Sequence, residues 1–71
     1  MVEVRSEMVA SVWKIRVGVG EAVQPDSVVV VLESMKMEIP VLAENPGRIA
    51  QVKVSAGDVV QEGEVLVIID D

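Results

Sequence analysis

The stretch GDVVQEGEVLVIID, residues 57–70, decides how this chain folds, because the sequence contains a version of it twice. Moved back by 37 residues (57 − 20), it falls on GEAVQPDSVVVVLE, residues 20–33, with identical or closely related residues at most positions. The same shift places Gly47–Val54 on Ala10–Val17. Similarity at one fixed spacing indicates an internal duplication within a single chain.

Both copies have the residue pattern of β-strands, and the chain contains 18 valines, which favour a pleated backbone. An alternating run predicts one strand in each copy, over Ser11–Val17 and Ile49–Val54. A continuous apolar run predicts a second, over Val28–Leu32 and Val65–Ile69, as expected for a strand covered on both faces. A buried helix is the alternative for the second runs, but their length and β-branching favour strands.

The turns between these runs carry residues with particular backbone conformations. Gly20, Gly57 and Gly63 can adopt positive φ, and Asn45-Pro46-Gly47 is a strong turn signal. Asp26 stands where the other copy has Gly63, so we expect it to adopt a strained left-handed conformation.

We therefore expect one all-β domain, residues 1–71, with copies at about residues 7–33 and 44–70. Each copy is too small to bury its own apolar strands, so the two should pack on each other about a pseudo-twofold axis, as a sandwich or flattened barrel. This axis would exchange the linker between the copies with the pair of chain termini. The linker and the termini should therefore lie at opposite ends of the domain.

Composition excludes several classes of function. The chain has no cysteine and no histidine, which removes thiol nucleophiles, imidazole bases, disulfides and the usual zinc sites. A net charge of -6 opposes binding to nucleic acid. The sequence shows no signal peptide and no apolar run long enough to span a membrane, so we expect a cytoplasmic protein. Because it lacks histidine and cysteine, we expect no enzymatic activity of its own.

The linker contains ESMKME, residues 33–38, in the middle of an otherwise valine-rich chain. Strands over Val28–Glu33 and Met37–Ala43 would flank a tight turn at Ser34–Lys36, with Lys36 projecting into solvent. Methionines usually fill gaps in a core, so Met35 and Met37 beside an exposed turn favour a recognition surface; packing within the hairpin is the alternative.

The motif Met35-Lys36-Met37 resembles that of the biotinyl/lipoyl attachment domains, and within them the biotin carboxyl carrier branch; lipoyl domains usually carry Asp-Lys-Ala there. The resemblance covers the whole chain, and Lys36 lies 35 residues (71 − 36) from its end. It implies two antiparallel four-stranded sheets without the protruding thumb of some carrier domains. The chain departs from the family at four positions near loops: Glu7, Val9, Ala10 and Ser34.

The resemblance also implies a function. Lys36 would be acylated with biotin by a biotin protein ligase, and the arm would serve biotin carboxylase and carboxyltransferase subunits. Met35 and Met37 would supply recognition contacts, with secondary contacts from Glu33, Ser34 and Glu38. No residue would be catalytic or bind a metal, and the domain would be a monomer.

Two other functions fit the same pattern. A lipoyl carrier would share the fold and the lysine, although the methionines argue against it. An unmodified structural adaptor would keep the hairpin and leave Lys36 free. Trp13, the only aromatic residue, aligns with Ala50 in the other copy, and we expect it to fill the core or an edge.

Overall fold

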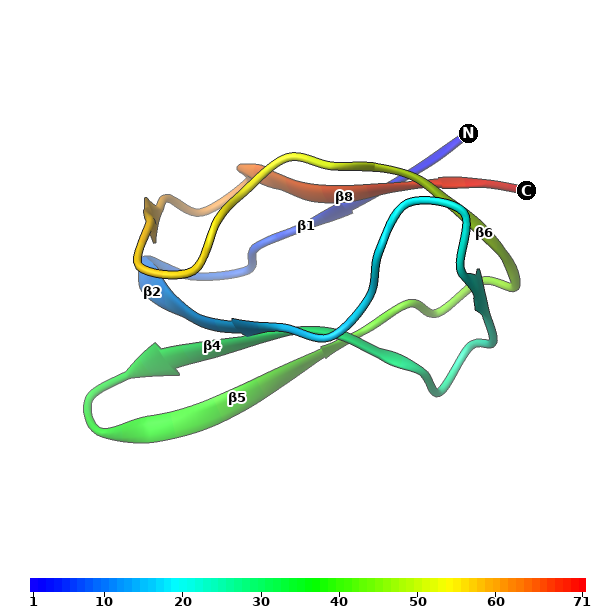
Figure 1. The fold of residues 1–71 in the computed structure, drawn as a ribbon. Coiled ribbons are helices and arrows are strands. Elements are labelled where there is room, and N and C mark those ends of the chain that lie inside the picture. The colour runs from blue at the N-terminus through cyan, green and yellow to red at the C-terminus, as the bar shows by residue number, and fades with distance from the viewer.

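The computed structural model describes all 71 residues and contains eight strands and no helix, which confirms the predicted all-β class. Figure 1 shows the strands arranged as a flattened barrel. In chain order the strands are β1 (Val2–Arg5), β2 (Ala10–Ile15), β3 (Ala22–Val23), β4 (Val28–Ser34), β5 (Met37–Leu42), β6 (Gly47–Val52), β7 (Val59–Val60) and β8 (Val65–Asp70).

The strands form two four-stranded antiparallel sheets, in the orders β1-β8-β6-β3 and β5-β4-β2-β7. The 37-residue shift carries β2 onto β6, β3 onto β7 and β4 onto β8, so it converts one sheet into the other. It also carries β1 onto residues 39–42 of β5, a pair that the sequence comparison leaves outside the repeat. The two sheets therefore have the same strand arrangement.

Matching bulges change which residues face the core. In β2, Val12 pairs with Leu32 and Lys14 with Val31, so Trp13 is the extra residue; Ala50 is its equivalent in β6. An extra residue reverses the alternation, so Val12 is buried while Trp13 remains 42% exposed with the Lys14 ammonium over its ring. Of the two expected places for Trp13, the core is therefore wrong, and so is the expectation that its strand alternates without interruption.

A second pair of bulges explains the continuous apolar runs. Val29 in β4 and Leu66 in β8 have no direct partner in the ladder beside them, because the register shifts at both places. Each bulge allows two successive side chains to face the core, and both Val29 and Val30 are fully buried. The runs are strands, as predicted, and the helical alternative is wrong.

The core lies between the two sheets and draws on almost every strand. Figure 1 shows the hairpin of β4 and β5 at one end and both chain termini at the other, as predicted. At that second end the Met1 ammonium lies 3.0 Å from Oδ1 of Asp71. The hydrogen bond and charge of this ammonium lower the pKa of Asp71. No helix in the structure is long and apolar enough to cross a membrane.

The turn before β4 differs from its counterpart before β8. In both turns the first carbonyl accepts a hydrogen bond from the fourth residue, Ser27 N–H to Gln24 and Glu64 N–H to Gln61. Gly63 has φ +86°, whereas Asp26 has negative φ, so the expected left-handed conformation at Asp26 is wrong. A type I turn reverses the chain with negative φ at both central residues, and only type II requires glycine at the third position.

Candidate functional site

The site begins with a two-residue hairpin. β4 ends at Ser34, β5 begins at Met37, and these two residues are paired, which leaves Met35 and Lys36 as the loop. Their φ angles are +53° and +65°. Positive φ at both central residues is typical of a type I′ turn, whose twist matches that of antiparallel strands. The predicted turn at this place is present, with Lys36 at its tip.

The residues at the tip are poorly suited to its backbone. A type I′ turn prefers Asn-Gly or Gly-Gly, because other residues bring Cβ close to the backbone at positive φ. Each of Met35 and Lys36 therefore carries a strain of about 1 kcal/mol or more. Strain of this kind persists where a sequence is retained for another purpose. Turn stability therefore does not explain the Met-Lys pair.

The side chains at the tip are presented to solvent. Met35 is 92% exposed and Met37 is 65% exposed, so neither fills a gap in the core. Lys36 is exposed, and its ammonium makes no hydrogen bond and no ion pair. The tip therefore offers an unpaired primary amine between two thioether side chains, while Ser34 below it is half-buried.

Two carboxylates lie below the turn, on the outer face of the hairpin. Glu33 and Glu38 are directly opposite each other across the strands, and both are exposed. Like charges in this position destabilise a sheet, and neither carboxylate has an ion-pair partner that would compensate. The pair gives the base of the tip a local negative charge. The structure contains no group of three or more acidic side chains that could hold a metal ion.

A groove, which the sequence did not indicate, lies beside the hairpin rather than at its tip. Its volume is about 450 Å³, and it is bordered by β1 on one side and β5 on the other. Neither Lys36 nor the flanking methionines line it. Sequence patterns could not reveal this groove, because its two walls are 30 or more residues apart and meet only in the folded chain.

Replacing Met35 by asparagine tests whether this side chain serves a recognition surface or only packs within the hairpin. Asparagine tolerates left-handed φ, so Met35→Asn is expected to stabilise the domain by about 0.5–1 kcal/mol. If a ligase acylates Lys36, as the resemblance in the sequence implies, and contacts Met35, the same variant would be acylated more slowly. Chemical denaturation and a time course of acylation measure the two effects. Unchanged acylation would leave Met35 without a recognition role.

A family model described as "Biotin-requiring enzyme" matches residues 2–69. The chain belongs to this family. A biotinylated protein TB7.3 homolog of Mycobacterium leprae is 49% identical over 67 residues, which are 94% of each chain. As a family member, the chain is a biotin/lipoyl attachment domain with the expected two-sheet fold.

Solved structures of two kinds of protein, a carboxylase and a lipoyl domain, contain the same fold. The urea carboxylase of Kluyveromyces lactis contains a region with TM-score 0.92 and 29% identity, which covers 97% of this chain and 6% of that one. The lipoyl domain of the 2-oxoglutarate dehydrogenase complex from Azotobacter vinelandii has TM-score 0.75 and 35% identity, over 89% of this chain and 80% of that one. The same fold therefore occurs within a carboxylase and in a lipoyl domain.

Proposed function

We propose that this domain is a biotin carrier in which Lys36 is the attachment residue. The observation that carries the proposal is the tip itself, where an exposed and unpaired lysine occupies a strained left-handed turn between Met35 and Met37. The name of the Mycobacterium leprae relative, a biotinylated protein, supports biotin as the attached group.

Attachment requires only the amine of Lys36 from this chain. Its Nζ attacks the acyl carbon of an adenylate-activated biotin held by a ligase; an amide bond forms and the adenylate leaves. The amine must also lose a proton, and the chain has no histidine to accept it. The base therefore comes from the ligase, and the domain acts as the substrate of this step.

After attachment, the role of the domain is to present the arm. Biotin supplies a ureido nitrogen that can carry a carboxyl group between a biotin carboxylase and a carboxyltransferase. The paired strands β4 and β5 hold Lys36 at the end of a molecule 32 Å long, while the core lies behind them. A rigid body with a flexible arm raises the local concentration of the group at a partner's site.

The side chains around Lys36 would select its partners. Met35 and Met37 offer adaptable apolar contacts to the ligase or to a carboxylase. Ser34 lies beside them in the ladder. The carboxylates of Glu33 and Glu38 would favour a basic partner surface, since complementary charge accelerates association and disfavours wrong partners.

A lipoyl carrier is the second candidate, and the likeness to the Azotobacter vinelandii lipoyl domain favours it. It would use the same lysine for a different acyl group. The methionines on both sides of Lys36 argue for biotin, because lipoyl domains usually carry Asp-Lys-Ala at this hairpin. An unmodified adaptor is the third.

Intact mass after incubation with a biotin ligase or with a lipoate ligase distinguishes the three. The biotin ligase is expected to add one biotinyl group to the wild type and none to Lys36→Arg, which keeps the charge but not the nucleophile. Lys14 and Lys53 remain in that variant as internal controls for non-specific acylation. A lipoyl-sized gain alone would favour the lipoyl carrier, and no gain with either ligase would favour the adaptor.

A further inference from the structure

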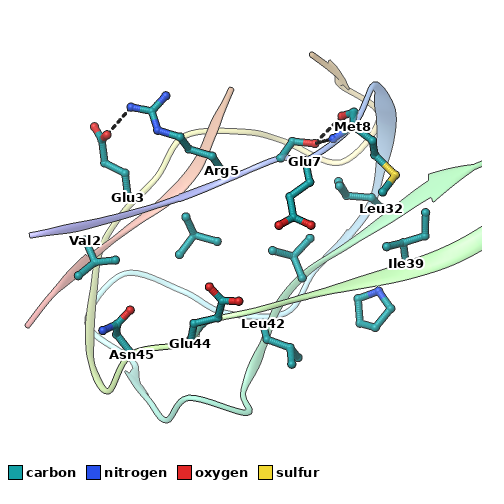
Figure 2. Close-up of a pocket in the computed structure, with 15 residues that line it drawn as sticks. Val2, Glu3, Arg5, Glu7, Met8, Leu32, Ile39, Leu42, Glu44 and Asn45 are labelled. Atoms are coloured by element: carbon teal, nitrogen blue, oxygen red, sulfur yellow. Dashed lines mark hydrogen bonds and ion pairs between the residues drawn. The ribbon is translucent and has the colours of Figure 1, made fainter. Parts of the chain in front are cut away.

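The groove between β1 and β5 has two ends at different distances from the tip. β2 begins beside Glu33, so the preceding residues Glu7 and Met8 border the end of the groove nearer the hairpin. Glu44 and Asn45 border the end nearer the chain termini. Figure 2 shows the carboxylates of Glu7 and Glu44 directed into the space between the strands. We call these the near end and the far end.

An arm on Lys36 can reach only the near end. An amide-linked biotin places its ring about 14 Å from the lysine Cα, from eleven bonds of ordinary length. Ile39, at the near end, is three residues along β5, about 10 Å from Lys36 on an extended strand. Glu44 is eight residues away, about 26 Å if the chain stays extended, and lies out of range.

The near end offers both kinds of contact that a biotin ring needs. Met8, Leu32 and Ile39 line it with apolar side chains, which suit the thioether half of the bicyclic ring. The carboxylate of Glu7 makes no hydrogen bond and no ion pair within the chain, so it is free to accept the ureido N–H groups. Arg5 on the same side is already paired with Glu3.

The near end is also held in place by a contact that the far end lacks. Ser6 is the one buried polar residue of the chain, and its hydroxyl donates to the Met8 carbonyl at 2.6 Å. The Met8 N–H in turn donates to Oγ of Ser6 at 3.3 Å. The 37-residue shift places Ala43 at the position of Ser6, so the far end has no such hydroxyl.

We propose that the near end of the groove is a resting site for the biotin ring attached to Lys36, an inference that rests on the proposed function. The tether gives the ring an effective concentration of about 1 mM at this site, so a weak intrinsic affinity is sufficient to populate it. A partner enzyme then competes with Glu7 and Met8 for the ring. The groove would thereby shield the ureido group from solvent while the arm is bound at neither partner site.

The test compares amide spectra of the ¹⁵N-labelled domain before and after biotinylation, with loading confirmed by intact mass. Shift changes are expected at Glu7, Met8 and Ile39 as well as at the tip, together with Overhauser contacts between ring protons and the Met8 methyl. Glu44 and Asn45 should not change. Changes confined to residues 34–38 in a fully loaded sample would overturn the inference and leave the proposed carrier function intact.

The repeat supplies a matched pair of variants for the same experiment. Glu7→Gln is expected to reduce the biotin-dependent shifts at Met8 and Ile39 by at least half, because it removes the charged acceptor. Glu44→Gln makes the same change at the far end and should leave those shifts unaltered. Equal effects of both variants would contradict a site at the near end. Failure to load Lys36 at all would remove the proposed function and this inference together.

Discussion

Gly47→Ala is expected to destabilise the domain by about 3 kcal/mol or more, a large part of its total stability. A Cβ at Gly47 would lie 2.6 Å from the Asp70 carbonyl oxygen and 2.7 Å from Cγ2 of Ile69. The first of these is backbone, so strands β6 and β8 would have to separate. Gly47 also has φ +156°, which a residue with a side chain rarely adopts.

Urea denaturation of the purified variants measures this effect through the shift of the midpoint at constant slope. Gly18→Ala is the matched control, because nothing lies within 4 Å of its added Cβ and its φ is not positive. It should change stability by less than about 1 kcal/mol. If Gly47→Ala were as stable as Gly18→Ala, close approach of β6 to β8 would not be the reason for glycine here.

Leu66→Ala is expected to have a comparable effect from the centre of the core. Leu66 is fully buried and is the bulged residue of β8, so its truncation removes apolar contacts and leaves a cavity in the core. Such truncations cost about 2–5 kcal/mol. A domain of 71 residues has a stability of about 4–11 kcal/mol, so much of the variant could be unfolded at 37 °C.

Thermal denaturation followed by circular dichroism compares this variant with Val19→Ala, which removes an apolar side chain that is 70% exposed. The midpoint of Leu66→Ala should fall by more than 10 °C, about what 2 kcal/mol produces in a domain of this size. That of Val19→Ala should move by a few degrees at most. Similar midpoints for both would mean that the region around Leu66 repacks.

The candidate site lies at the exposed hairpin tip, away from the core. The exposed Met35 and Lys36 contribute nothing to the core, and their strained turn weakens the fold slightly. Variants at the tip should therefore change attachment while the domain stays folded. Variants at Gly47 and Leu66 should instead destabilise the fold, and any loss of attachment would follow from that.

Some features were determined by the sequence itself. The 37-residue repeat and the valine-rich runs were sufficient to predict an all-β domain of two related sheets. The position of the repeat linker was sufficient to predict a hairpin with Lys36 at its tip, opposite the termini. These predictions succeed because strand propensity, turn chemistry and the spacing of a repeat act locally or through simple symmetry.

Other features could not be predicted from the sequence. The bulges at Trp13 and Val29 depend on how each strand pairs with its neighbour, so local alternation assigned Trp13 to the wrong face. The negative φ of Asp26 follows from a turn type that the sequence left open. The groove arises where the edges of β1 and β5 meet. The bulges and the groove depend on contacts between distant residues, which no local pattern encodes.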